Sequence, residues 1–89
     1  SSDLWFNTKN IHGSHTIIKL GLDKDVPKTT IVEAAELAAY YSKGRDSSQV
    51  PVDFTQIKNV KKPNGAKPGM VIYDYYNTIY VTPKELKNE

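Results

Sequence analysis

Apolar and polar residues follow the period of a β-strand in three separate parts of this chain. Short apolar or β-branched runs occupy residues 4–6 and 15–20, and residues 50–55 alternate between apolar and polar side chains. Successive side chains of a strand point to opposite faces, so such patterns are typical of strands with one buried face. We therefore predict strands over these three ranges, the third extending toward Lys61.

A helix is predicted over residues 30–43, where Ala, Leu and Glu are abundant. Thr30 and Glu33 have the spacing of a capping box, in which a hydroxyl and a carboxylate satisfy free backbone N–H groups at the helix start. Gly44 follows as a natural helix end. One face of this helix is expected to be apolar and to consist of Ile31, Ala34, Ala35, Ala38 and Tyr41.

A β-hairpin is predicted over residues 70–82. Residues 70–73 and 78–82 are apolar or β-branched, and the short segment 74–77 joins them tightly. With the helix, these strands predict an α+β fold in which one main helix packs on an antiparallel or mixed sheet. The length of 89 residues predicts a single domain.

Enzymatic and metal-dependent functions find little support in the sequence. The chain has no Cys, so no thiolate can act as nucleophile or metal ligand. His12 and His15 have a spacing suited to metal binding, but a metal site needs three or four ligands and there is no third His. Ser14 and His15 are adjacent, so on a strand they point to opposite faces, which suits a nucleophile and its base poorly. We expect no catalytic residue, no metal and no cofactor.

A membrane role is not expected either. No stretch of the chain is long and apolar enough to cross a bilayer, and no signal peptide is recognisable. The lack of Cys fits a protein of the cytoplasm, which is the location we expect, with the cell surface as the alternative.

The positive charges of the chain are segregated, although its net charge is only +2. Between Lys43 and Lys67 the acids are Asp46 and Asp53 alone, whereas the cations are Lys43, Arg45, Lys58, Lys61, Lys62 and Lys67. Such a stretch is typical of a surface that binds a polyanion, and an ordinary solvated surface is the alternative interpretation.

The segment from Lys58 to Lys67 is the strongest candidate site. It offers four ammonium groups in ten residues, and Pro63 and Pro68 restrict its conformations. Exposed cations with amide and backbone donors suit phosphate contacts. Tyr75 and Tyr76, in the predicted turn, could stack on unpaired bases, and cross-strand packing is the alternative for both.

Three stretches of the chain together resemble one known family, the RNA-binding domain of NFACT proteins. They are residues 3–15 (DLWFNTKNIHGSH), residues 33–43 (EAAELAAYYSK) and residues 50–69, which contain VPVDFT, KNVKKP and GAKPG. The resemblance covers nearly the whole chain. It implies a larger parent protein with an N-terminal module, a coiled-coil middle and this domain near its C-terminus.

The resemblance also implies a function. Proteins of this family act in ribosome-associated quality control, where they bind stalled large subunits and tRNA so that a C-terminal tail is added to the nascent chain. Bacterial members often carry the label of fibronectin- or fibrinogen-binding proteins. The expected partners are thus tRNA and large-subunit ribosomal RNA, with ribosomal proteins as further candidates. The alternative is a protein-binding module of an adhesin, with an extracellular matrix protein as partner.

Two departures from the family pattern bear on these expectations. Asn7 stands where the family usually has His, and His12 where it usually has Pro. Asn keeps hydrogen-bonding capacity but cannot titrate near neutral pH. The family domain also begins with strands that precede the Trp5-Phe6 motif, so we expect an N-terminally truncated domain with an exposed sheet edge. The residues expected to contact RNA are Lys9, Ser14, His15, Lys43, Arg45, Lys58, Lys61, Lys62 and Lys67.

Overall fold

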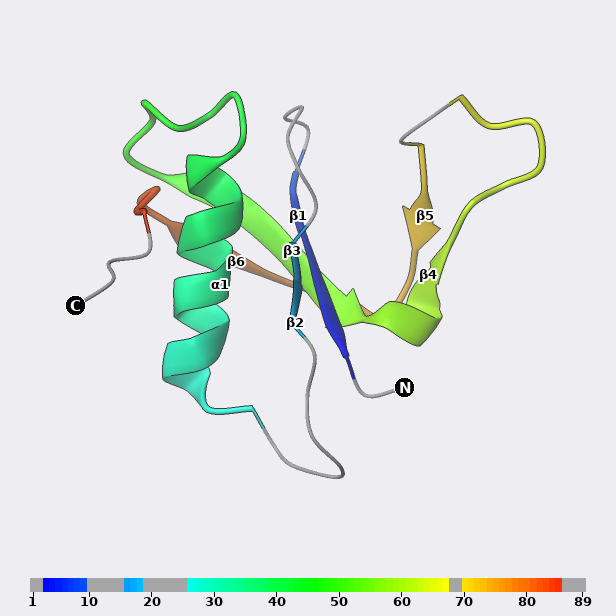
Figure 1. The fold of residues 1–89 in the computed structure, drawn as a ribbon, viewed down its shortest axis with the longest axis horizontal. Helices are drawn as coiled ribbons and strands as arrows, with labels where there is room; N and C mark the ends of the chain where they lie inside the picture. The colour runs from blue at the N-terminus through cyan, green and yellow to red at the C-terminus, as the bar shows by residue number, and fades with distance from the viewer. Residues whose placement is uncertain (1–2, 10–15, 19–25, 68–69, 86–89) are drawn as a thin grey trace.

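The computed structural model describes residues 3–9, 16–18, 26–67 and 70–85, and within these ranges it shows an α+β fold, as predicted (Figure 1). The elements in chain order are β1 (Leu4–Thr8), β2 (Thr16–Ile18), α1 (Lys28–Tyr40), β3 (Val50–Gln56), the 3-10 helix η1 (Ile57–Asn59), β4 (Val60–Lys61), β5 (Ile72–Tyr73) and β6 (Asn77–Val81). In these ranges no helix is both long and apolar enough to cross a membrane.

Four strands form an antiparallel sheet in the order β2-β1-β3-β6. Phe6 of β1 pairs with Phe54 of β3, and Val52 of β3 pairs with Ile79 of β6. β1, which carries the Trp-Phe motif, therefore lies inside the sheet and not at its edge. The described strands at the two edges are β2 and β6.

The apolar core lies between α1 and one face of this sheet. Alternate residues of the strands point to this face, among them Phe6, Val50, Val52 and Val81. The helix meets them with side chains that are almost all methyl groups, which lets its backbone approach the strands closely. The buried helix residues are Ala34, Ala35, Ala38 and Ala39. Ala39 thus takes the place predicted for Tyr41, which is exposed.

The helix starts two residues before the predicted position and has no capping box. Pro27 is the N-cap residue, and no side chain caps the first turn. The carbonyl of Pro27 accepts hydrogen bonds from the backbone N–H groups of Thr30 (3.0 Å) and Ile31 (3.2 Å). The prediction for Thr30 and Glu33 was therefore wrong, because a proline with fixed φ just before the helix already sets its direction.

The helix also ends earlier than predicted, at Tyr40. The buried hydroxyl of Ser42 donates to the carbonyl of Ala39 (2.7 Å) and accepts from the backbone N–H of Gly44 (3.0 Å). A side-chain oxygen thus satisfies backbone groups at this end, a task that was expected of a glycine cap.

The predicted hairpin over residues 70–82 does not form. Its two strands exist, but β5 pairs with β4 in a separate two-stranded sheet, and β6 pairs with β3. Residues 74–76 carry the chain from one sheet to the other. The prediction failed because strands close in sequence found better partners farther away, which a local pattern does not reveal.

The segment from η1 to β5 is called the arm below, and its described residues are 57–67 and 70–73. Figure 1 shows the arm on the side of the sheet away from α1. The polar residues of the alternating strand β3 point to this side, and the arm covers them. Asp53 and Thr55 are consequently buried, whereas the sequence pattern alone predicted a half-exposed strand.

Candidate nucleic-acid interface

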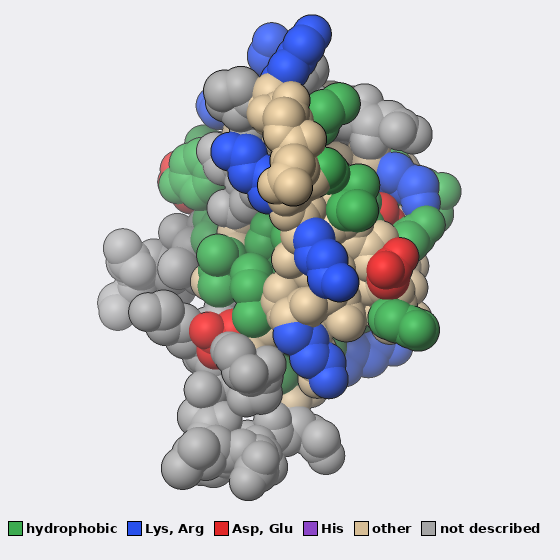
Figure 2. Space-filling model, turned by 90° about the vertical axis from the view of Figure 1, so that its right-hand side faces the viewer, with side chains coloured by type: hydrophobic (Ala, Val, Ile, Leu, Met, Phe, Trp, Pro, Cys, Tyr) green, Lys and Arg blue, Asp and Glu red, His purple; other side chains and the backbone are tan. Residues whose placement is uncertain are grey.

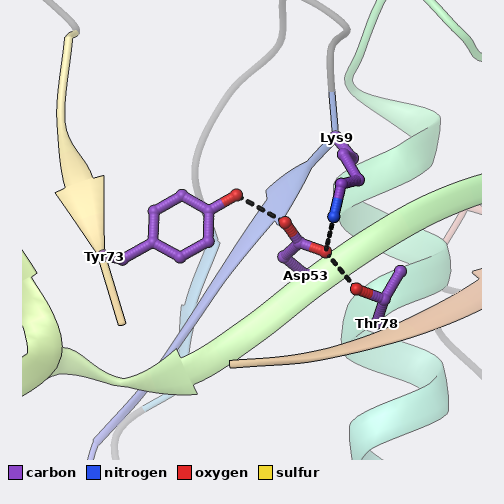
Figure 3. A network of polar contacts seen from close by, with 4 residues as sticks. All are labelled: Lys9, Asp53, Tyr73 and Thr78. Atoms are coloured by element: carbon purple, nitrogen blue, oxygen red, sulfur yellow. Dashed lines mark hydrogen bonds and ion pairs between the residues drawn. The ribbon is translucent and has the colours of Figure 1, made fainter. Parts of the chain in front are cut away.

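A buried carboxylate joins the arm to the sheet (Figure 3). Asp53 is only 1% exposed. Its Oδ2 accepts a hydrogen bond from the Tyr73 hydroxyl (2.5 Å), and its Oδ1 accepts one from the Thr78 hydroxyl (2.5 Å). The Nζ of Lys9 lies 3.7 Å from the same Oδ1. A carboxylate can be buried at acceptable cost only with such donors and a cation, so these four residues form one unit, the Asp53 hub.

Aromatic rings extend the hub toward the surface. The ring of Tyr73 lies 4.8 Å from that of Trp5 and 5.1 Å from that of Tyr76, between centroids. The Nζ of Lys9 lies 4.9 Å from the centroid of Tyr76. Tilted ring pairs and a cation above a ring are favourable because the ring faces are electronegative and the edges electropositive. Tyr73 of the arm is therefore fixed from three sides.

Lys9 was predicted to contact RNA, and the structure gives it internal partners. Partial burial lowers its pKa, but the Asp53 carboxylate and the Tyr76 hydroxyl outweigh this effect and leave the pKa raised. The side chain stays cationic at neutral pH and offsets the charge of Asp53. Since 39% of the side chain is exposed, its outer part still reaches solvent.

The hub changes the ionisation of Tyr73. Burial and the hydrogen bond to Asp53 raise the pKa of Tyr73 to about 12, against an opposing hydrogen bond from Asn7. Asn7, one of the two departures from the family pattern, is thus a hydrogen-bond partner of the hub. Both main causes favour the neutral phenol, because a phenolate would lie buried beside a carboxylate.

A second buried group shapes the end of the arm. The Thr55 hydroxyl lies within hydrogen-bond distance of the carbonyls of Asp74 (2.9 Å) and Tyr75 (3.1 Å), and it accepts a hydrogen bond from the Asn59 amide (3.0 Å). The backbone N–H of Asp74 donates to the carbonyl of Asn59 (3.2 Å). These contacts hold Tyr75 at a φ of 52°, in the left-handed region that bulky residues avoid.

The four lysines of the predicted site project from the arm into solvent. Lys58, Lys61, Lys62 and Lys67 are all exposed. In the described part of the chain none of their ammonium groups has an acidic partner, and residues 54–73 contain no Asp or Glu. Figure 2 looks at the arm side of the molecule and shows positively charged side chains spread along it, with hydrophobic side chains between them. The cations of the arm are therefore available to an anionic partner.

The other predicted site residues do not join this group. Lys43 and Arg45 are exposed on the turn that follows α1, which lies on the opposite side of the molecule from the arm in Figure 1. The Arg45 guanidinium stacks over the ring of Tyr40 at 4.8 Å. Ser14 and His15 lie outside the described residues. Among the described residues, no three His, Asp or Glu side chains gather as metal ligands would.

The hub itself was not predicted from the sequence. A signal was present, since Asp is disfavoured within strands and Asp53 stands between Val52 and Phe54 in the alternating segment. An acid at such a position needs a partner. The partners Tyr73 and Thr78 are 20 and 25 residues away in sequence, and no local pattern identifies them.

Comparisons with known proteins show which family the chain resembles. The family model described as the NFACT protein RNA binding domain matches residues 1–74. The protein Rqc2 homolog RqcH of Bacillus subtilis is 56% identical over 81 residues, which are 91% of this chain and 14% of that protein. Rqc2 homolog RqcH of Streptococcus pneumoniae is 49% identical over 86 residues, which are 96% of this chain and 15% of that protein.

A solved structure shares the fold. It is the C-terminal part of the fibronectin/fibrinogen-binding protein from Streptococcus suis, with a TM-score of 0.84 and 46% sequence identity. The match covers 94% of this chain and 33% of that one. The chain therefore spans a small part of the curated relatives that it matches, 14% and 15% of their lengths.

Removal of the hub carboxylate is expected to destabilise the fold strongly. Asp53→Ala leaves two hydroxyl donors and one ammonium group without their acceptor, which we expect to lower the free energy of unfolding by about 3 kcal/mol. Urea denaturation measures this change. Asp46→Ala, at an exposed position, is the control and should change stability by less than about 0.5 kcal/mol. Equal effects of the two variants would refute the role of Asp53.

The raised pKa of Tyr73 predicts a specific loss of stability at high pH. The folded pKa of about 12 exceeds the unfolded value of 10.0. The neutral phenol therefore contributes stability that is complete below pH 10.0 and is lost as the pH rises toward about 12. The free energy of unfolding of the native chain should fall more steeply in this window than that of Tyr73→Phe. Parallel curves for the two proteins would argue against a coupled Tyr73.

The backbone conformation of Tyr75 predicts that glycine is tolerated there. Glycine adopts a positive φ without the cost of about 1–2 kcal/mol that other residues carry, although it also raises the entropy of the unfolded chain. Because the Tyr75 side chain is mostly exposed, little packing is lost. We expect Tyr75→Gly to leave thermal stability unchanged or to raise it by up to about 1 kcal/mol. A lower stability of Tyr75→Gly than of the native chain would mean that the ring stabilises the fold.

Proposed function

The chain belongs to the NFACT protein RNA-binding domain family, and on that premise we propose that it binds RNA through the exposed lysines of the arm. The observation that carries this proposal is a group of four ammonium groups that have no acidic partner in the described part of the chain, on a segment that contains no acid. Phosphate oxygens are their natural partners, because binding releases the counterions of the nucleic acid. Such contacts fix the position of the RNA and carry no sequence information by themselves.

The Asp53 hub supports this role by fixing the arm on the sheet. Two short strands alone would be marginal, since β4 and β5 contain two residues each. The Tyr73–Asp53 hydrogen bond and the Trp5–Tyr73 ring contact attach the arm to the sheet. A fixed arm loses less entropy when it binds, so its lysines contribute more affinity. Lys43 and Arg45, on the other side of the molecule, would contact a different stretch of RNA.

We further propose that the parent protein is a ribosome-associated quality control factor. The support is the similarity to proteins named Rqc2 homolog RqcH. In this proposal the parent acts in the cytoplasm, binds stalled large subunits and tRNA, and promotes C-terminal tailing of nascent chains. The domain has no enzymatic role of its own. Its partners are tRNA and large-subunit ribosomal RNA, with ribosomal proteins as further candidates.

A second candidate function is protein binding by a fibronectin- or fibrinogen-binding adhesin. It is favoured by the name of the solved Streptococcus suis protein and by two exposed apolar residues on the arm, Met70 and Ile72. The two candidates differ in their response to salt. A protein contact through apolar groups depends weakly on ionic strength, whereas a phosphate contact depends on it steeply.

The proposal predicts how the arm lysines affect RNA binding. With tRNA as ligand, the logarithm of the binding constant should fall linearly with the logarithm of the salt concentration. Lys61→Ala combined with Lys62→Ala should reduce the magnitude of this slope by about 1.5, because each phosphate contact contributes roughly 0.7–0.9. A filter-binding series across salt concentrations measures both slopes.

The matched control removes two positive charges elsewhere. Lys28 and Lys84 are exposed and lie outside the arm, so replacing both with Ala changes the net charge equally. We expect this variant to keep the slope of the native chain. If the slope of the Lys61/Lys62 variant equals that of the native chain, or if both variants lower it alike, RNA binding through the arm is refuted.

A further inference from the structure

We propose that Tyr75 is a stacking site for an unpaired nucleobase of the bound RNA. The inference rests on the proposed RNA binding and extends it, because it adds a recognition element that phosphate contacts lack. The site is the ring of Tyr75, at the junction between β5 and β6, next along the chain to Tyr76, whose ring carries Lys9 above it. Its ligand is a single-stranded stretch of RNA whose bases are free to leave their own stack.

Neither the exposed ring of Tyr75 nor its backbone conformation stabilises the fold. The residue is 87% exposed, so its ring contributes little to packing. Its φ of 52° is unfavourable for a bulky side chain, and glycine would relieve this strain. Backbone strain persists only where surrounding contacts hold it, and such positions cluster at binding sites. A large aromatic ring at a strained and exposed position is therefore better explained by a ligand than by stability.

Hydrogen bonds fix the backbone that carries the ring of Tyr75. The hydroxyl of Thr55 reaches the carbonyl of Tyr75, and the amide of Asn59 donates to the same hydroxyl. The neighbouring Tyr76 is fixed as well, because Tyr73 contacts its edge and Lys9 lies over its ring. The ring of Tyr75 thus projects from a rigid support. A ring on a fixed backbone loses less entropy on binding than a ring on a mobile loop, which favours a stacking site.

The charges around Tyr75 suit a nucleotide better than an uncharged apolar partner. Lys58 is exposed and adjacent to Asn59, whose carbonyl is hydrogen-bonded to the backbone of Asp74. Lys9 lies over the ring of Tyr76, the next residue along the chain after Tyr75. The exposed Asp74 carboxylate balances Lys58, and Asp53 balances Lys9, so the excess positive charge on this side of the molecule comes from Lys61, Lys62 and Lys67 of the arm. An exposed aromatic ring beside a segment rich in cations is the pattern of single-strand binding surfaces.

The experiment uses a short single-stranded RNA that carries the fluorescent base 2-aminopurine, whose emission is quenched when the base stacks. Four forms of the chain are compared, namely the native chain, Tyr75→Gly, Tyr75→Phe and Tyr80→Ala. Tyr75→Gly removes the ring without adding strain, whereas Tyr75→Phe keeps the ring. Tyr80, on β6, is 67% exposed and serves as the control for loss of an exposed tyrosine. A blunt RNA duplex is the second ligand, since its bases are already stacked.

We expect Tyr75→Gly to weaken binding of the single strand by about 5- to 100-fold and to abolish the quenching on binding. Tyr75→Phe and Tyr80→Ala should bind as the native chain does, and duplex affinity should not change in any variant. If Tyr75→Gly binds and quenches the single strand like the native chain, the stacking site is refuted while RNA binding by the arm stands. If no form binds either RNA, the proposed function itself fails. If only binding to a ribosomal protein is lost in Tyr75→Gly, the ring serves a protein partner and the inference is wrong.

Discussion

The structure depends on one buried carboxylate. Asp53 lies in the middle of a central strand and is shielded from water, so its charge must be balanced by neighbouring groups. Tyr73, Thr78 and Lys9 provide that balance, and they come from three other parts of the chain. A chain in which any of these parts is misplaced leaves a charge buried without compensation. The hub therefore selects one arrangement of the sheet and the arm over alternatives with a similar apolar core.

The two faces of the sheet consequently hold the molecule together in different ways. One face packs on the alanines of α1, where only shape and apolar area matter. The other face carries Asp53 and Thr55, and hydrogen bonds with defined directions join it to the arm and to the junction at Tyr75. Directional contacts specify position better than apolar packing does. The arm lysines and Tyr75 lie on or beside this second face, so the polar contacts that fix the arm also orient these proposed RNA-binding groups.

The sequence predicted the positions of the helix and the strands better than it predicted which strands pair with each other. The alternation over residues 50–55 identified β3, and the alanine-rich segment identified α1, because both patterns are local. The ends of α1 shifted since Pro27 and Ser42 do the capping that was expected of Thr30 and Gly44. The hairpin over residues 70–82 was wrong because β5 and β6 pair with β4 and β3. For the site, the exposed lysines of the arm could be predicted from charge alone. Their separation from Lys43 and Arg45 could not, because it depends on how the arm packs.

Native-state hydrogen exchange of the backbone amides in Asp53→Asn is the most direct test of the hub. This variant keeps the size of the side chain and removes its charge. If the hub fixes the arm, the amides of β4, β5 and Asp74 should exchange faster by an order of magnitude or more, and they should lose more protection than the amides of α1, whose protection falls only as far as the whole fold is destabilised. If the arm amides in Asp53→Asn retain native protection, or if α1 and the arm lose protection to the same extent, the arm does not depend on Asp53 in the way described.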